Sequence, residues 1–302
     1  MKVFITGGTG FVGSSLSAAL AGEGHEVTIL TRSSPSGREF PRGVSLLTGD
    51  PTAPGQWQEA VPDHPVIINL AGTSIFRRWS RSTKEAMRES RLATTRNLEQ
   101  AISRGRGSVR QMLSISAVGY YGFRDEGDLD EESPPGEGFL AELSREWEFA
   151  ARQAEAFDVK TALLRFGVVL GRHGGALHQM IPPFRWHLGS PLGSGKQWFS
   201  WIHEQDLAGI FLFLLRRGEI SGPFNCTAPN PVRNEEMTRI LGTALGKPTF
   251  MPAVPSFLLR LLMGEFATVV LKGQKVLPRR LISLGFQFRY GDLRGALADL
   301  LS

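Results

Sequence analysis

The chain has 302 residues, of which 41% are hydrophobic and 21% are charged, and its formal net charge is +5. This length allows one large α/β domain with a smaller lobe, and the composition is that of a globular protein, not a fibrous or disordered one. The single cysteine, Cys226, excludes an internal disulfide framework. Because the histidines and this cysteine show no zinc-ligand spacing, we expect no metal.

The excess of basic residues does not by itself predict nucleic-acid binding. Between positions 77 and 91, six arginines and lysines are interleaved with Glu85 and Glu89 at helical spacing, which is typical of a solvated helix face. We therefore expect a small-molecule substrate, and neither nucleic acid nor a membrane, as partner, while a homodimer is left open. A cytoplasmic location is expected because no secretory signal is visible and the longest apolar run, Leu207 to Leu215, is too short to span a bilayer.

Up to about residue 170, apolar β-branched runs alternate with amphipathic segments and short turns. This alternation predicts a Rossmann-type α/β fold, a doubly wound parallel sheet with helices on both faces. The expected strands cover residues 2–6, 26–31, 44–48, 65–70, 110–115 and 159–167. The expected helices cover residues 11–23, 82–104 and 138–155.

The character of the chain changes after Gly171. Residues 189–196 form a Gly-rich stretch that we interpret as a connector, and from Asn234 onward short helical segments alternate with Pro-rich turns. We therefore expect two parts. The first is an NADP-binding domain over residues 1–170 that also receives residues 197–226, and the second is a small C-terminal α/β substrate lobe of residues 171–196 and 227–302.

A glycine-rich turn follows the first strand directly and opens the first helix. Gly7 would let the chain turn off the strand, Gly10 would let a pyrophosphate approach the backbone, and Gly13 would let helix and strand pack closely. The helix start would then offer free N–H groups and a positive dipole end to the phosphates. We expect the cofactor to contact Gly7, Thr9, Gly10, Phe11, Val12 and Gly13.

The end of the second strand predicts the choice of cofactor. An NAD enzyme usually carries an acidic residue here for the ribose 2′-hydroxyl, whereas this chain reads Thr31-Arg32-Ser33. Because a basic side chain accommodates a 2′-phosphate, we expect NADP; the alternative is that Arg32 is solvated and selects nothing. Further cofactor contacts are expected where the third and fourth strands end, at Asp50, Asn69, Leu70, Ala71 and Gly72.

Several other residues have structural interpretations. His203 and Asp206 are expected to orient backbone between the two lobes, and the acidic run from Asp125 to Glu132 is expected to be a solvated loop. Three tryptophans are expected in the core: Trp147, Trp198 and Trp201.

The motifs together carry a family resemblance. The turn at residues 7–13, Asn69–Gly72 and Ser114–Gly122 resemble an extended short-chain dehydrogenase/reductase. A more specific resemblance, to a branch of sugar-nucleotide epimerase-like proteins with a short C-terminal domain of unknown function, rests on Arg165–Gly171, Gly174–Leu177, Gln197–His203, Asp206, Asn225–Pro229 and Gly273–Pro278. The resemblance implies that Arg91, Ser114 and Arg165 also belong to the cofactor site.

In that superfamily a serine or threonine works with a Tyr-x-x-x-Lys pair on the following helix, and the resemblance places Ser116 at the serine position. The pair itself is missing, because the residues four after Tyr120, Tyr121 and Tyr290 are Arg124, Asp125 and Arg294. Without a lysine, a phenol with its reference pKa of about 10 is protonated at neutral pH.

Tyr121 and Glu142 are candidate substitutes for the missing pair; alternatively, Tyr121 packs beneath the cofactor and Glu142 is solvated. Two functions follow from these observations. The first is an NADP-dependent epimerase or oxidoreductase acting on a hydroxylated substrate, with a nucleotide-linked sugar as one candidate. The second is a non-catalytic NADP-binding protein.

Overall fold

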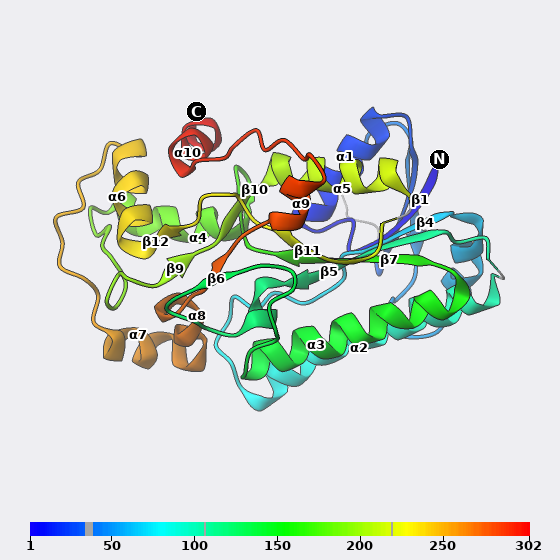
Figure 1. Cartoon of the computed structure of the whole chain (residues 1–302), viewed down its shortest axis with the longest axis horizontal. Coiled ribbons are helices and arrows are strands. Elements are labelled where there is room, and N and C mark those ends of the chain that lie inside the picture. Colours follow the sequence, from blue (N-terminus) through cyan, green and yellow to red (C-terminus); the bar gives the residue numbers. More distant parts are fainter. Residues whose placement is uncertain (34–38, 106, 219) are drawn as a thin grey trace.

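The computed structural model describes residues 1–33, 39–105, 107–218 and 220–302, and it is built around one seven-stranded parallel sheet (Figure 1). The strand order is β11-β7-β5-β4-β1-β2-β3, and every neighbouring pair is parallel. The bounds are β1 Lys2–Thr6, β2 Glu26–Thr31, β3 Val44–Thr48, β4 Val66–Asn69, β5 Gln111–Ala117, β7 Lys160–Phe166 and β11 Gly222–Cys226. The predicted doubly wound fold and its six strands are confirmed.

Helices cover both faces of the sheet because its side chains are apolar on both. Val3 and Ile5 face helices α1 (Phe11–Gly22) and α5 (Glu204–Arg217), which contact each other. Phe4 faces the opposite way, toward α2 (Arg81–Arg104), which packs against α3 (Phe139–Arg152). Figure 1 shows these two helix layers above and below the sheet. This is the burial that near-continuous apolar strands require.

The C-terminal part is made of short elements around a second apolar cluster. Helices α6 and α7 lie at the end of the sheet away from the N-terminus (Figure 1). The further helices are α4 Gly175–Arg185, α6 Asn234–Ala244, α7 Ser256–Met263, α8 Ala267–Leu271, α9 Arg279–Ser283 and α10 Leu293–Leu301. The short strands are β6 Asp128–Leu129, β8 Val168–Gly171, β9 Trp198–Phe199, β10 Trp201–His203, β12 Val232–Arg233 and β13 Lys275–Val276. The 3-10 helices are η1 Gln56–Asp63, η2 Val118–Tyr121, η3 Gln153–Phe157 and η4 Gly264–Phe266.

A polar clamp at the start of α5 attaches the C-terminal segment. The Asp206 carboxylate accepts hydrogen bonds from the backbone N–H groups of Arg289 and Tyr290 at 2.8 and 2.9 Å. His203 caps α5, its Nδ1 accepting from the backbone N–H of Gln205, and its ring stacks on Tyr290 at 3.8 Å. Burial lowers the pKa of His203, although Asp299, 3.3 Å from Nε2, acts in the opposite direction. Asp206 thus orients the backbone of the C-terminal segment, as expected, whereas the backbone contact of His203 lies within α5.

Two expectations about side-chain environment need correction. Trp147 and Trp201 are buried, but Trp198 is half-exposed, with the guanidinium of Arg233 lying 3.7 Å from its ring centroid. The acidic run is not wholly solvated, because Leu129 pairs in strand β6 and the Glu131 carboxylate is buried, where it accepts the backbone N–H of Asn225 at 3.0 Å. Within the described residues, no helix combines the length and the apolar character needed to cross a membrane.

Candidate functional site

The glycine turn joins β1 to α1 at the switch point of the sheet, where β1 lies between β2 and β4. Gly7 has φ +72°, and a Cβ there would lie 2.7 Å from the carbonyl carbon of Leu70, so only glycine fits. A Cβ on Gly13 would overlap the carbonyl oxygen of Gly7. The turn lies at the carboxyl edge of the sheet beside the switch point, the position at which such folds bind ligands.

The start of α1 has the properties of a phosphate site. Gly10 is the exposed N-cap residue, and among the described residues no side chain caps this helix and no acidic residue lies in its first turn. The first-turn N–H groups and the positive dipole end therefore remain available to an anion. The cradle fits the pyrophosphate of a dinucleotide.

Phe11 and Val12 connect this turn to the rest of the fold. The Phe11 ring lies against Gly171 and Gly174, where a Cβ would overlap it, and Val12 packs on the main core. The turn that should hold the pyrophosphate is thus in direct contact with the segment that leads into the C-terminal lobe. The sequence did not predict this contact between the two parts.

The ends of β2 and β3 bring two of the expected cofactor residues, Arg32 and Asp50, near each other. Arg32 and Ser33 are exposed, and Thr31 donates to the carbonyl of Ser33 at 2.8 Å. The pKa of Asp50 is lowered mainly by hydrogen bonds from the side chain and backbone of Thr52, with a smaller contribution from the charge of Arg32. The Arg32 side chain is therefore exposed at the end of β2, and its expected contact with a 2′-phosphate stays a prediction.

Asn69, at the end of β4, and Ser114, opposite it in the middle of β5, are both fully buried. The Asn69 side chain accepts from Thr6 at 2.7 Å and donates to Thr95 and Ser114 at 2.9 and 3.2 Å. These bonds hold β1, β4, β5 and α2 together. Direct contact of Asn69, Ser114, Leu70 or Ala71 with the cofactor stays a prediction.

Arg91 lies beneath the loop that follows β4. Its guanidinium donates to the carbonyls of Met87 and Thr73 at 3.0 and 3.1 Å, and a Cβ on Gly72 would lie 3.1 Å from its Cζ. Burial lowers its pKa to about 10, which leaves it charged at neutral pH. Because no carboxylate pairs with it within the described ranges, it adds uncompensated positive charge at the cofactor edge.

The two strongest catalytic candidates belong to one buried polar network. The Ser116 hydroxyl donates to Oε1 of Glu148 at 2.7 Å. Arg165 donates to both oxygens of Glu148, from Nε at 2.8 Å and Nη2 at 2.9 Å, and its Nη1 donates to the Tyr121 hydroxyl at 2.8 Å. Tyr121 in turn donates to Oδ1 of Asn225 at 2.7 Å. The network spans β5, α3, β7 and β11.

Tyr121 is poorly suited to act as an acid or base in this network. It is 0% exposed, and burial raises its pKa to about 12, although the charge and hydrogen bond of Arg165 act the other way. Burial alone would lower the pKa of Arg165, but the hydrogen bonds and charge of Glu148 raise it overall. Arg165 therefore stays charged, and its guanidinium is hydrogen-bonded to Glu148 and Tyr121. Its expected contact with the cofactor stays a prediction.

Glu142 is separate from this network. It is exposed in the first turn of α3, whereas Glu148, which the sequence analysis missed, is buried on the same helix. Helix α3 contains neither tyrosine nor lysine. Glu148 directly follows the buried Trp147 on the inner face of the helix. A carboxylate next to this buried tryptophan is the sequence signal from which a buried, paired glutamate could have been predicted.

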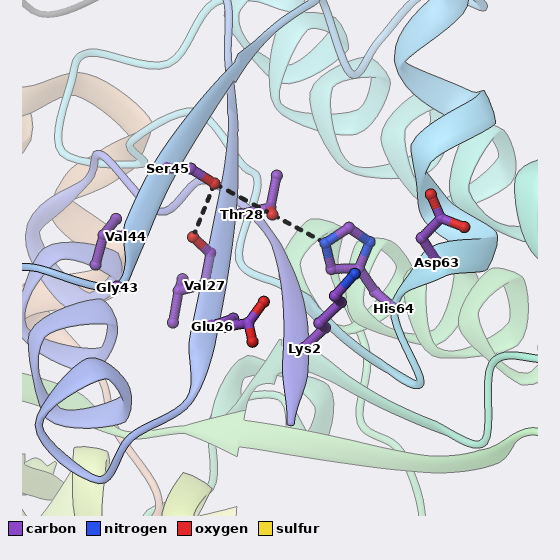
Figure 2. A pocket seen from close by; sticks show the side chains of 9 residues that line it. All are labelled: Lys2, Glu26, Val27, Thr28, Gly43, Val44, Ser45, Asp63 and His64. Atoms are coloured by element: carbon purple, nitrogen blue, oxygen red, sulfur yellow. Dashed lines mark hydrogen bonds between the residues drawn. The ribbon is translucent and has the colours of Figure 1, made fainter.

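Two cavities lie at opposite edges of the sheet. One of about 440 Å³ is lined by residues at the amino ends of β1–β3, including Lys2 and Glu26, and by His64 at the end of η1 (Figure 2). It is remote from the glycine turn, because amino and carboxyl strand ends lie at opposite edges. The other, of about 200 Å³, lies between η2, the start of α3 and the segment η4–α8. This second cavity is on the side where the missing Tyr-x-x-x-Lys pair would be sought.

Comparison with known proteins agrees with this geometry. A model described as the NAD dependent epimerase/dehydratase family matches residues 3–227. The chain belongs to that family. A second model, of a domain of unknown function (DUF1731), matches residues 254–300. Both parts of the expected resemblance are thereby confirmed.

Relatives of this epimerase family match the chain over its full length. The chloroplastic epimerase family protein SDR39U1 homolog of Arabidopsis thaliana is 43% identical, over 100% of this chain and 87% of its own. Human epimerase family protein SDR39U1 (isoform2), crystallised with NADPH, is 36% identical, with a TM-score of 0.87 and 99% of each chain covered. A nucleoside-diphosphate sugar epimerase from Corynebacterium glutamicum is 35% identical, with a TM-score of 0.80 over 100% of this chain and 58% of that one.

Proposed function

We propose that the chain binds NADP(H) and catalyses hydride transfer at a hydroxyl- or carbonyl-bearing carbon of a small molecule, as an oxidoreductase or as an epimerase. The observation that carries this proposal is the glycine turn at the β1/β4 switch point, which leads into an uncapped helix start. The NADPH in the human SDR39U1 crystal structure and the exposed Arg32 support NADP as cofactor. Nucleotide-linked sugars are the first compounds to test, given the description of the Corynebacterium protein.

The roles of the chain's own residues follow from the network. When bound, NADPH supplies a hydride to a carbonyl carbon; one proton added to the oxygen completes the alcohol. The Ser116 hydroxyl donates its hydrogen bond to Glu148, so its oxygen lone pairs remain free to accept a hydrogen bond from a substrate hydroxyl. Glu148 and Arg165 fix the rotamer of Ser116 in this arrangement.

Cofactor choice should depend on Arg32. We expect Arg32→Ala to weaken NADPH binding by about 10- to 100-fold, because a charge-assisted hydrogen bond contributes about 1.5–3 kcal/mol, and to leave NADH affinity nearly unchanged. Arg42→Ala is the matched control, because Arg42 is also exposed but lies just before β3, at the amino edge. Titration calorimetry with both cofactors measures the effect. Equal wild-type affinity for NADPH and NADH would contradict this assignment.

Turnover should depend on Ser116. We expect Ser116→Ala to lower the rate with any compound that turns over by up to about 10-fold, because the substrate hydroxyl loses its hydrogen-bond acceptor, while NADPH affinity stays within the error of the wild type. Cofactor absorbance at 340 nm and epimer analysis by NMR measure the rate. A Ser116→Ala variant as active as wild type would remove Ser116 from the mechanism.

A second candidate function is a non-catalytic NADP-binding protein. Two observations favour it. The Tyr121 hydroxyl is held by hydrogen bonds to Arg165 and Asn225, and burial raises its pKa to about 12. Helix α3 contains neither tyrosine nor lysine. NADPH binding without cofactor oxidation or epimerisation, over a broad panel of sugar nucleotides and carbonyl compounds, would favour this candidate.

A further inference from the structure

The cavity of about 200 Å³ beside η2 has a composition unlike that of a sugar or phosphate site. Its ten described lining residues include no arginine or lysine, and the side chains with a charge or hydroxyl group are two glutamates and one threonine. The lining residues are Trp79, Gly119, Gly122, Phe123, Glu137, Gly138, Phe139, Leu140, Glu265 and Thr268. Phosphate recognition in proteins relies on arginine, lysine or helix N-terminal N–H groups. Among the lining residues only the start of α3 offers such N–H groups, and Glu142 in its first turn disfavours an anion there, so this lining is poorly suited to a diphosphate.

Aromatic rings form the outer wall of the cavity. Trp79 meets Phe139 edge-on with 5.4 Å between ring centroids, and it also contacts the ring of Phe266 at 5.9 Å. The Trp79 indole N–H is already satisfied, because it donates to the carbonyl of Ile75 at 3.0 Å. The wall therefore offers ring faces and edges to a ligand, and aromatic surfaces of this kind bind apolar groups.

The charged groups at the rim do not favour an anion either. Glu265 pairs with Nζ of Lys84 at 2.5 Å, and this ammonium also lies 5.1 Å from the Phe139 ring centroid. Glu137 is exposed. With Arg78 beside Gly264, the rim carries two carboxylates and two basic groups, so it offers no excess of positive charge to an anionic substrate.

The position of the cavity connects it to the proposed chemistry. Gly119 lines it three residues after Ser116, and a Cβ on Gly119 would lie 3.1 Å from the Cβ of Leu140 at the start of α3. Its volume is below the roughly 300–1,000 Å³ of pockets that bury a drug-sized ligand, so it has room for about one ring or a branched chain.

We infer that this cavity binds the apolar end of an uncharged ketone or secondary alcohol, with an aromatic or branched aliphatic group among the aromatic side chains and the oxygen directed toward the end of β5. The inference rests on the proposed function for its reaction, but its binding part can be measured without turnover. A nucleotide-linked sugar would be a poor ligand of this cavity.

The test is calorimetry on the full chain loaded with NADP⁺, with acetophenone, cyclohexanone, UDP and UDP-glucose as probes. We expect the two ketones to bind, and UDP and UDP-glucose neither to bind nor to displace acetophenone. Thr268→Trp should fill the cavity and weaken acetophenone binding by about tenfold or more. Thr243→Trp, at an exposed position on α6, is the control and should bind acetophenone like the wild type.

A second variant, Leu140→Ala, keeps the inference testable if Thr268→Trp fails to fold. Leu140→Ala enlarges the cavity, so it should improve binding of 2-acetylnaphthalene relative to acetophenone. UDP-glucose binding that displaces acetophenone, or ketone affinities unchanged in both cavity variants, would overturn the inference. Ketone binding that responds to these variants, but without NADPH oxidation, would support the inference and count against the proposed hydride transfer alone.

Discussion

Gly10→Val should weaken NADPH binding by on the order of 100-fold, about 2.7 kcal/mol of binding free energy, while the protein still folds. Gly10 has φ −74° and ψ 178°, which valine adopts readily, and its added Cβ would meet only the carbonyl oxygen of Gly7, at 3.2 Å. The branched side chain would instead occupy the space over the start of α1. The loss would therefore come from exclusion of the pyrophosphate and not from disruption of the turn.

A matched control exists at the other end of the same helix. Gly22 is exposed in the last turn of α1, and the space that a Cβ would occupy there is open, so Gly22→Val adds the same side chain away from the phosphate site. NADPH affinity measured by calorimetry should stay at the wild-type value in this variant. A folded Gly10→Val protein, verified by circular dichroism, with wild-type NADPH affinity would remove the turn from the cofactor site.

The parts of the structure that could be predicted are those encoded by local patterns. The turn from Gly7 to Gly13 follows an apolar strand and precedes an amphipathic helix, and each of these features is visible within a dozen residues. The seven-stranded sheet follows from repetition of such units, because right-handed crossover connections leave few other topologies. For this reason the fold and the phosphate cradle agree with the expectation.

The polar network could not be predicted, because its members are far apart in the sequence. Glu148 meets Arg165 across 17 positions, and Tyr121 meets Asn225 across 104. Apart from its place next to Trp147, nothing local distinguishes the buried Glu148 from the exposed Glu142 on the same helix, since packing against β5 and β7 decides which carboxylate needs a partner. The same limit applies to Trp198, whose neighbours Arg233 and Lys275 come from other elements.

Helix α3 carries two ion pairs of equal length in different environments, and they should differ strongly in their contribution to stability. Glu148 lies 2.8 Å from Arg165 with side chains 6% and 3% exposed, whereas Glu146 lies 2.8 Å from Arg88 with side chains 40% and 34% exposed. Glu148→Ala should lower the free energy of unfolding by about 3–5 kcal/mol, because it leaves a buried guanidinium without a counter-charge. Glu146→Ala should cost no more than about 1 kcal/mol, because solvent screens the exposed pair.

A double variant separates the cost of the lone charge from the value of the pair. Glu148→Ala combined with Arg165→Met removes both charges, so we expect it to unfold at a higher urea concentration than Glu148→Ala alone. Because Arg165 also donates to Tyr121, the double variant should still be less stable than the wild type. Urea unfolding followed by circular dichroism at neutral pH gives all four free energies. Equal losses of unfolding free energy for Glu148→Ala and Glu146→Ala would show that burial does not determine how much these ion pairs stabilise the protein. In that case the pair of Glu148 and Arg165 could not be said to hold Ser116 rigidly, as its proposed role requires.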